Sequence, residues 1–312
     1  WIYVPEGTWT ENLVIGNSNT TLYGSGWGTI IDGLIAADAI SVGGNNCTIR
    51  DLACRTTAGG GSGFQAMELS GNNIRVSNVY IYGSDSAGIY VNAGLRAIIE
   101  NCYIGPCDAE GIFVNGDNCT ITNCEINTTG ASAIVCQAES LVSNCHIINV
   151  TGYGIDVNGG GDDSVIIGNS ISTTSDDGIY LNAGAEYCVV TGNKIQGWTN
   201  QPVDDDSGTS VVASNNAGGS VMNSLGCSHL TIQGAIDHVE AFGGGGWIEI
   251  PARAASWVEN LTIEDDGIEL RGQGEWSILQ PSNASGVGIT VSGDYDGVII
   301  RDLSIDTKTS SS

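Results

Sequence analysis

A short sequence pattern returns every 21 to 25 residues between residues 73 and 195, and this repeat limits the fold more than any other feature. One half of the pattern reads Cys119-Thr-Ile-Thr-Asn-Cys-Glu-Ile126, and the other half reads Gly111-Ile-Phe-Val-Asn115. The asparagine of the first half recurs at Asn78, Asn101, Asn123, Asn144, Asn169 and Asn193. A fixed period in this range is typical of a solenoid in which each repeat forms one coil.

Each half of the repeat predicts a short β-strand, because apolar residues alternate and a turn rich in Gly, Asn and Ser follows. No window of the repeat region shows helical periodicity, and the leucine frame of leucine-rich repeats is missing. The remaining solution is an all-β parallel β-helix, whose strands stack about 4.8 Å apart. We expect residues 10–197 to form seven or eight coils, with the six asparagines in one hydrogen-bonded ladder.

The interior of this solenoid is predicted from the same register. One inward column should contain Ile89, Ile112, Ile134, Ile155 and Ile179, with Ile121 in another. Cys102, Cys124 and Cys145 each follow an asparagine of the ladder, so they should stack in consecutive coils. Stacked cysteines are compatible with buried thiols or with a disulfide. We favour buried thiols, because three consecutive cysteines cannot all form disulfides within the stack.

The end of the chain repeats its beginning. Trp247 to Pro251 matches Trp1 to Pro5, and Arg301-Asp302-Leu303 matches Arg50-Asp51-Leu52. We expect a first β-helix module over 1–200 without its N-terminal cap, a polar linker or loop over 201–226, and a second module starting at 227. A cap helix over 228–242 should open this second module, which continues to residue 312 with its first coils. An upstream segment is expected before Trp1.

The segment Thr231-Ile-Gln-Gly-Ala-Ile236, followed by glycines and Trp247-Ile-Glu-Ile-Pro251, resembles the start of pectin-lyase-like right-handed β-helix proteins. The resemblance implies that an amphipathic helix covers the open end of the solenoid. The repeats are similar to those of pectinases, phage tailspikes and large surface proteins. This resemblance implies a fold and leaves the function open, because the fold carries many functions.

The charge balance excludes some partners. Asp and Glu outnumber Lys and Arg by 35 to 9, which gives a net charge of −26. This charge disfavours nucleic acids and anionic membranes, and no stretch is apolar enough to insert into a membrane. We therefore expect cations, glycans or other copies of the protein as partners. No cofactor is required by any motif.

The strongest catalytic candidates are Asp176 and Asp177, which precede a strand as in polygalacturonases, where paired carboxylates carry out acid–base chemistry. Asp85, Asp108 and Glu110 are expected in the corresponding turn of earlier coils. Intervening coils interrupt this acidic surface, and no Lys or Arg occurs between Arg96 and Lys194. The sequence thus favours a protein that is not an enzyme, with no cleavage of pectin, polygalacturonate or alginate.

Calcium and glycosylation sites are further candidates. Oxygen ligands for Ca²⁺ are available at Asp162-Asp163, at Asp204, Asp205 and Asp206, and at Asp294 and Asp296, although such turns are often simply solvated. Glycosylation sequons occur at Asn19, Asn46, Asn118, Asn127, Asn149, Asn260 and Asn283.

Two functions are compatible with these features. The first is an extracellular structural or adhesive protein that forms a stalk, sheath or fibre on a cell or virion by end-to-end association. The second is a carbohydrate-active β-helix, either a polysaccharide hydrolase or a tailspike-like glycan binder. Outward-facing aromatic side chains at Tyr90, Phe113 and Tyr180 would favour the second function, because they could stack on sugar rings.

Overall fold

The protein was analysed as a computed structural model. It describes residues 1–34, 37–56, 63–92, 96–137, 139–199, 202–206, 212–214, 216, 221–223, 225, 228–229, 231–241, 245–252, 256–282 and 288–306. Two compact units are present, Trp1–Val211 and Val212–Ser312, and each is described by itself.

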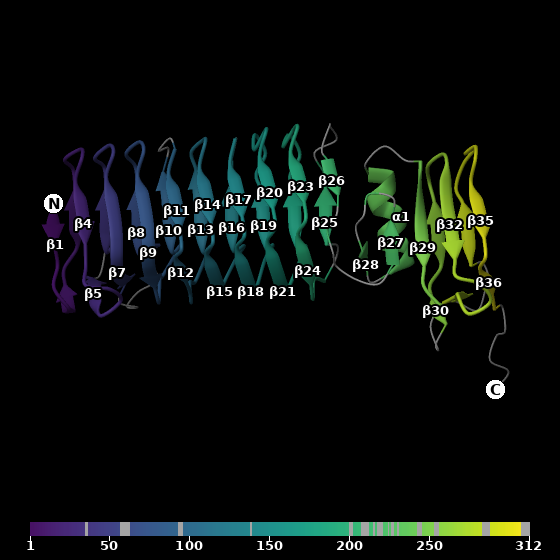
Figure 1. Cartoon of the computed structure of the whole chain (residues 1–312), viewed down its shortest axis with the longest axis horizontal. Helices are drawn as coiled ribbons and strands as arrows, with labels where there is room; N and C mark the ends of the chain where they lie inside the picture. Colours follow the sequence, from purple (N-terminus) through teal and green to yellow (C-terminus); the bar gives the residue numbers. More distant parts are fainter. Residues whose placement is uncertain are drawn as a thin grey trace. The chain divides into compact units, whose positions relative to one another are not determined.

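The first unit is a right-handed parallel β-helix (Figure 1). One side of its coils is a nine-stranded parallel sheet. Its strands are β3 (Leu13–Ile15), β6 (Ile40–Val42), β8 (Met67–Leu69), β10 (Ile89–Asn92), β13 (Ile112–Asn115), β16 (Ile134–Cys136), β19 (Ile155–Val157), β22 (Ile179–Leu181) and β25 (Val203–Asp205). Eight of these strands fall within residues 10–197, in agreement with the coil number expected from the period.

Two further columns of strands complete the coils of the first unit. The first column contains β1 (Ile2–Tyr3), β4 (Thr21–Tyr23), β7 (Thr48–Thr56), β9 (Arg75–Ile81), β11 (Ile98–Glu100), β14 (Thr120–Thr122), β17 (Leu141–Ser143), β20 (Val165–Ile167) and β23 (Val189–Thr191). The second contains β2 (Gly7–Thr10), β5 (Thr29–Gly33), the later parts of β7 and β9, β12 (Tyr103–Ile104), β15 (Glu125–Thr129), β18 (His146–Val150), β21 (Ser170–Thr174) and β24 (Lys194–Gln196).

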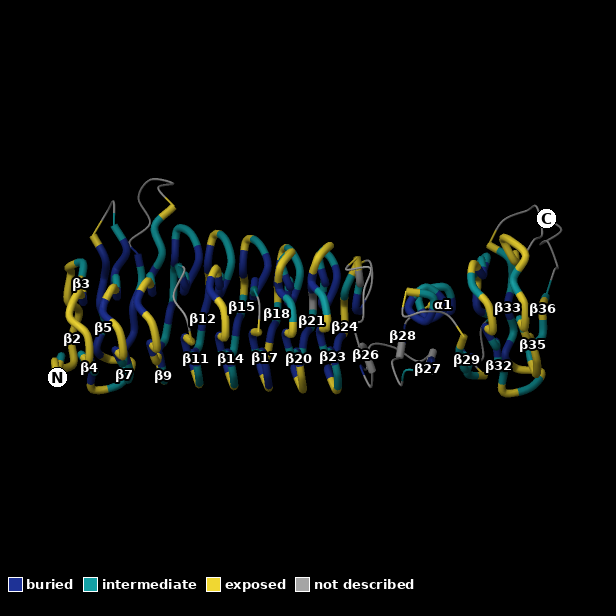
Figure 2. The backbone as a smooth tube through the Cα atoms, turned by 90° about the horizontal axis from the view of Figure 1, so that it is seen from above, coloured by how far each residue is buried: buried dark blue, intermediate teal, exposed yellow. Residues whose placement is uncertain are grey.

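Buried aliphatic residues recur in the successive coils of the first unit, and Figure 2 colours the buried stretches dark blue. The register pairs Ile89 with Ile112, then Ile134, Ile155 and Ile179, and all five side chains are completely buried. Ile121 lies in a separate inward column between Ile99 and Val142. Both interior predictions are confirmed. Burial of each such side chain contributes about 1.5–3 kcal/mol, and this repeated term holds the solenoid together.

The six recurring asparagines occupy two positions, so the single ladder expected from the sequence is corrected. Asn78, Asn101, Asn123 and Asn144 lie at an exposed bend with φ of 52–53°, which asparagine tolerates. Gly168 and Gly192 take this bend in the next two coils, with φ of 69° and 67°.

Asn169 and Asn193 lie one residue further on, at an inward position where each is 1% exposed. The Asn169 side-chain amide donates to Asn193 Oδ1 at 3.0 Å and to the Val142 carbonyl at 3.1 Å. Asn169 Oδ1 accepts the Cys145 backbone N–H at 2.9 Å. These two asparagines therefore form a buried ladder that satisfies backbone groups inside the bend.

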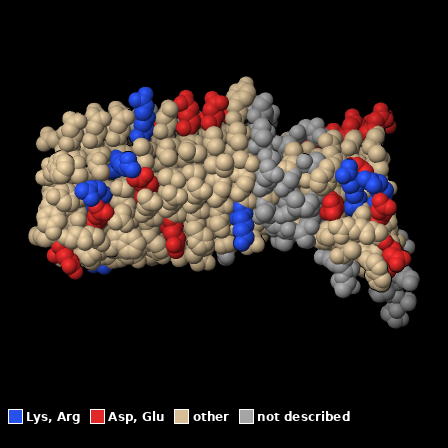
Figure 3. Space-filling view, viewed as in Figure 1, with Lys and Arg blue, Asp and Glu red and all other residues tan. Residues whose placement is uncertain are grey.

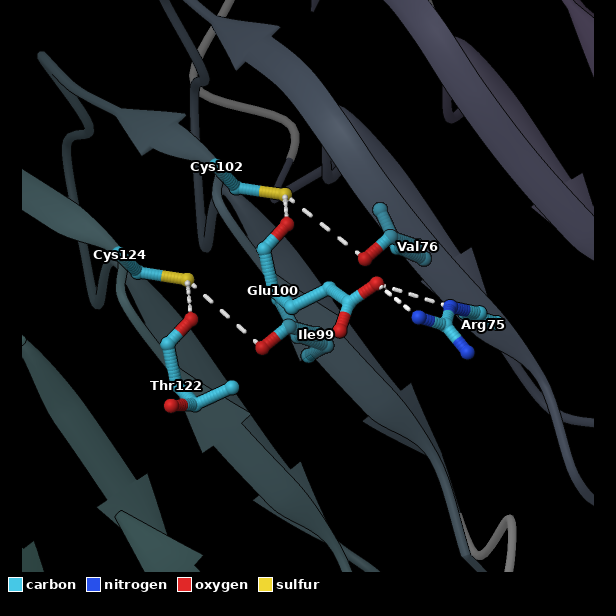
Figure 4. Close-up of polar contacts among 7 residues, drawn as sticks. All are labelled: Arg75, Val76, Ile99, Glu100, Cys102, Thr122 and Cys124. Atoms are coloured by element: carbon cyan, nitrogen blue, oxygen red, sulfur yellow. Dashed lines mark hydrogen bonds and ion pairs between the residues drawn. The ribbon is translucent and has the colours of Figure 1, made fainter. Parts of the chain in front are cut away.

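Cys102, Cys124 and Cys145 occupy this same inward position in the three preceding coils, as expected. Figure 4 shows the first two of these cysteines. Their thiols point to the carbonyls of Val76, Ile99 and Ile121, at sulfur–oxygen distances of 3.9, 3.7 and 3.9 Å. The nine described cysteines are all buried free thiols. A hydrogen bond with Cys102, followed by burial, raises the pKa of the Cys124 thiol, which disfavours its reactive thiolate form.

The second unit begins with β26 (Val212–Ser214) and contains β27 (Val221–Asn223), β28 (Ser228–His229), α1 (Ile232–Ala241), β29 (Gly246–Ile250), β30 (Trp257–Val258), β31 (Leu261–Ile263), β32 (Ile268–Gly272), β33 (Ile278–Gln280), β34 (Ile289–Val291), β35 (Ile299–Arg301) and β36 (Ser304–Ile305). Strands β29, β32 and β35 stack in parallel, while β27 pairs with β29 in the antiparallel direction.

Helix α1 forms over ten residues of the expected cap helix. It buries Ile232, Ala235, Ile236 and Val239 against the coils of the second unit. The Glu259 carboxylate accepts the backbone N–H of Ile232 at 2.9 Å, which satisfies a donor at the helix N-terminus and fixes the helix to the β-helix. Leu230 and Phe242, which fall within the expected range of the cap helix, lie outside the described residues.

The repeat of the chain is visible in matching contacts. The indole N–H of Trp9 donates to the Pro5 carbonyl at 3.1 Å, and that of Trp257 donates to the Pro251 carbonyl at 3.3 Å. The matching aspartates Asp51 and Asp302 both have left-handed φ, of 56° and 54°. The first unit extends past the expected boundary at residue 200, because β25 pairs with β22 as a ninth strand of its sheet.

Candidate functional site

Polar and aromatic side chains line the outer side of the nine-stranded sheet in three rows. The leading row lies two residues before the start of each strand and contains Glu110, Ser132, Tyr153 and Asp177, of which Ser132 and Asp177 are buried. The central row points outward from mid-strand and contains Glu68, Tyr90, Phe113, Val135, Asp156, Tyr180 and Asp204. The trailing row contains Asn92, Asn115, Gln137, Asn158, Asn182 and Asp206.

The residue between the leading row and each strand is small because the coils approach closely there. A Cβ atom on Gly154 would lie 2.4 Å from the Gly178 carbonyl oxygen, and one on Gly178 would lie 2.2 Å from Ile195. This spacing explains the recurring Gly-Ile pair. It also fixes the leading-row side chains directly beside the outward side chains of the strands.

Two tyrosines form the centre of the candidate site. Tyr153 from the leading row and Tyr180 from β22 stack with ring centroids 4.6 Å apart and an angle of 20° between the rings. Burial raises the pKa of Tyr153, as do the nearby carboxylates of Asp176, Asp177, Asp156 and Asp204. The Tyr180 hydroxyl lies 2.9 Å from Asp206 Oδ2. Both phenols therefore stay neutral near pH 7 and can donate hydrogen bonds.

Asp156 is the carboxyl group best suited to proton transfer in this cluster. It lies in β19, between Val135 and Tyr180 in the central row. Burial raises its pKa from 3.8 to about 6, and the nearby charge of Glu110 contributes in the same direction. Its Oδ1 atom is buried and makes no hydrogen bond within the described part of the protein. A carboxyl group with a pKa of about 6 can carry a proton to a substrate near neutral pH.

A second carboxyl group with a raised pKa lies further along the same unit. Burial, with a smaller contribution from the adjacent Glu68 of the central row, raises the pKa of Asp38 to about 6. The Asn92 amide donates to Glu68 Oε1 at 2.9 Å. Side-chain amides also bond along the trailing row, where Gln137 donates to Asn115 at 3.2 Å. The outer face thus offers acids, phenols and amides over several consecutive coils.

The structure brings together several residues that the sequence singled out separately. Asp176 and Asp177 lie at the Tyr153–Tyr180 pair, and so do Asp204 and Asp206. Glu110 shares the leading row with Asp177. Asp85 and Asp108 are elsewhere, since each follows the paired positions Ser84 and Cys107.

The remaining candidates are not assembled into a site. Asp294 and Asp296 are exposed in the second unit, and the side chain of Asp205 is outside the described residues. Within the described ranges, no group of three or more His, Cys, Asp or Glu side chains is arranged to hold a metal ion. The sequon residues Asn19, Asn46, Asn118 and Asn149 are exposed, Asn127 and Asn260 are half-buried, and Asn283 is outside the described residues.

Sequence reasoning missed Asp156 and Tyr153. A signal for Asp156 existed, because it is the charged residue at the position that holds Tyr90, Phe113, Val135 and Tyr180 in other coils. Tyr153 had no such signal, because its role depends on contact with residues of the following coil. Tyr90 and Phe113 do lie on the outer face, with ring centroids 5.4 Å apart.

The chain belongs to the family of right-handed β-helix proteins. The family model described as "Right handed beta helix region" matches residues 16–171. Comparison with curated protein sequences finds no match.

Solved structures with the same fold include an epimerase, a phage tailspike and a lyase. The A-module of the mannuronan C-5 epimerase AlgE4 from Azotobacter vinelandii is 14% identical, with a TM-score of 0.58 over 97% of this chain and 88% of its own. Tailspike protein 2 of bacteriophage CBA120 is 12% identical, with a TM-score of 0.59 over 99% and 48%. An alginate lyase from Paenibacillus is 17% identical, with a TM-score of 0.51 over 70% and 86%. At these identities the likeness establishes the fold alone.

None of the helical segments in the described part of the chain has the length and apolarity needed to cross a membrane.

Proposed function

We propose that the protein is a carbohydrate-active β-helix that binds a polysaccharide along the outer face of the nine-stranded sheet and hydrolyses it. The observation that carries this proposal is the Asp156 carboxyl, with its raised pKa and its buried Oδ1 atom, beside the Tyr153–Tyr180 pair. The mannuronan epimerase and the alginate lyase of the same fold support the binding of a polysaccharide by analogy.

The residues on the outer face of the nine-stranded sheet suggest how the protein would hydrolyse a polysaccharide. Asp156, protonated below pH 6, serves as the general acid that protonates the leaving oxygen of the glycosidic bond. Asp176 is half-buried beside the tyrosine pair, where a carboxylate can activate water or attack the anomeric carbon, as in the two-carboxylate mechanism of glycosidases, whereas Asp177 is only 2% exposed. The neutral Tyr153 and Tyr180 hydroxyls and the amides of the trailing row bind sugar hydroxyl groups.

The charge of this face favours an uncharged polysaccharide. Acidic side chains surround the tyrosine pair, and the chain has no Lys or Arg between residues 97 and 193 to neutralise them. A polyuronate would be repelled by this field, while the hydroxyl groups of a neutral sugar can donate to the carboxylates. The expected inactivity towards pectin, polygalacturonate and alginate follows from the same argument.

The test is a hydrolysis assay with the full chain at pH 4 to 8. The substrates are the uncharged polysaccharides xylan, mannan, β-glucan and dextran, together with alginate and polygalacturonate. New reducing ends are expected from at least one uncharged polymer, with loss of about 100-fold or more in rate for Asp156→Asn. The exposed Asp294→Asn serves as the matched control. Absence of turnover with every polymer, or turnover that Asp156→Asn leaves intact, contradicts the proposal.

A structural or adhesive role on a cell or virion surface is the second candidate. It is favoured by the repeated module, in which Trp9 and Trp257 make the same contact. In this role, modules associate end to end outside the cell, with salt or Ca²⁺ screening the net charge of −26. Light scattering over a salt and Ca²⁺ series tests it, and a monomer under all conditions would contradict it.

A further inference from the structure

A cluster of aromatic side chains lies on a different side of the first unit, over β7, β9 and β12. The Trp27 and Tyr80 ring centroids are 5.1 Å apart, those of Tyr80 and Tyr82 are 5.2 Å apart, and those of Tyr80 and Tyr103 are 4.9 Å apart. Since β9 and β12 pair in the second strand column, this cluster is separate from the three rows of the nine-stranded sheet.

An open hollow adjoins this cluster. Its volume is about 340 Å³, and its lining residues are Trp27, Asn78, Asn101, Cys102, Tyr103, Asn123 and Glu125. This volume is at the lower end of the range of about 300–1,000 Å³ that is usual for small-ligand sites. We name it the Trp27 hollow.

Trp27 is held in a fixed position while it stays accessible. Its side chain is 47% exposed, and its indole N–H donates to the Asn78 carbonyl at 3.2 Å. Tyr80 and Tyr103 by themselves would provide stabilising aromatic stacking between coils, so the solenoid does not need Trp27 for this purpose. An anchored, half-exposed indole at the edge of a hollow instead offers a preformed flat surface to a ligand.

The polar lining of the hollow matches sugar hydroxyl groups. Asn101 and Asn123 occupy the exposed bend, and their amides offer both donors and acceptors. Glu125 is the single charged residue of the lining. Arg55, whose guanidinium lies over the Tyr82 ring of the aromatic cluster, is already paired with Asp32 at 2.7 Å. This balance disfavours anionic ligands. In Figure 3, most of the visible face of the first unit is uncharged, with a few charged side chains of both signs.

We infer that the Trp27 hollow binds a ring of an uncharged sugar, stacked on the indole and hydrogen-bonded by Asn101, Asn123 and Glu125. A pyranose ring has an apolar C–H face and a rim of hydroxyl groups, which match the indole face and the amide rim. The Trp27 hollow binds the sugar without cleaving it, and this binding is independent of the proposed hydrolysis at Asp156.

The test is isothermal titration of the full-length Asp156→Asn variant with cellohexaose, xylohexaose, mannohexaose and maltohexaose. This background prevents hydrolysis of the probe. Binding of at least one hexasaccharide is expected, and Trp27→Ala should weaken it about 10-fold or more, as for an aromatic residue at a binding hot spot. The matched control is Trp276→Ala, which removes an exposed indole from the second unit.

A second variant tests the hydrogen bonds without straining the backbone. Asn123→Gly removes an amide at φ 52°, and Gly168 and Gly192 show that glycine fits this bend. It should weaken binding several-fold while the circular dichroism spectrum stays unchanged. The inference is overturned if no hexasaccharide binds at millimolar concentration, or if Trp27→Ala binds as tightly as its parent. Either result leaves hydrolysis by the native protein unaffected, so the two proposals fail separately.

Discussion

Replacement of Asn169 by alanine tests the buried asparagine ladder. In the native protein the Asn169 side chain accepts the Cys145 backbone N–H and donates to the Val142 carbonyl and to Asn193 Oδ1. Alanine leaves the buried Cys145 N–H without its acceptor, which costs about 1–3 kcal/mol, and removes two donated bonds worth about 0.5–1.5 kcal/mol each. We expect a total loss of about 2–6 kcal/mol in the free energy of unfolding.

The matched control for this variant is Asn144→Gly. Asn144 occupies the exposed bend at φ 53°, where Gly168 stands in the next coil, so its loss should change stability by less than about 1 kcal/mol. Urea unfolding of both full-length variants, followed by circular dichroism, gives the comparison. If both variants lose the same stability, or if Asn144→Gly loses more, the division of the asparagines into two positions is wrong.

Three further predictions follow from the interior and the site. Ile112→Asp places a lone carboxylate in the completely buried column, and it should lower the free energy of unfolding by several kcal/mol; a melting curve like that of the parent would contradict the inward assignment. Asp156→Asn should raise the melting temperature at pH 7.5 but not at pH 3.5. The folded-state pKa of Asp156 is raised to about 6, so the native protein loses stability as the pH rises from about 3.8 to 6; equal effects at both pH values would exclude this linkage. The described thiols should react with a disulfide reagent only in denaturant, because they are buried, and rapid native labelling of Cys124 would refute this.

The fold was predictable because every coil repeats the same inward positions. The isoleucine column from Ile89 to Ile179 needed only the period and the alternation of apolar residues. The asparagine positions were harder to predict, because they depend on how many residues separate each asparagine from the preceding buried residue. Asn123 follows Ile121 by two residues, whereas Asn169 follows the equivalent Ile166 by three.

The candidate site was only partly predictable. Asp176 and Asp177 stand out as an acidic pair before a strand, and the structure places them at the site. The raised pKa of Asp156 could not be foreseen, because it comes from burial among side chains of neighbouring coils and from Glu110 two coils earlier. Such contacts depend on the register between coils, which a single repeat does not specify.

The most direct test of the proposed function is a crystal structure of the Asp156→Asn variant with an oligosaccharide of the polymer that the native protein cleaves. The account predicts sugar rings along the outer face of the nine-stranded sheet, across β16, β19 and β22, with a glycosidic oxygen within hydrogen-bonding distance of residue 156 and a sugar hydroxyl group bonded to Tyr153 or Tyr180. An oligosaccharide bound only elsewhere on the protein, with this face empty, would contradict it.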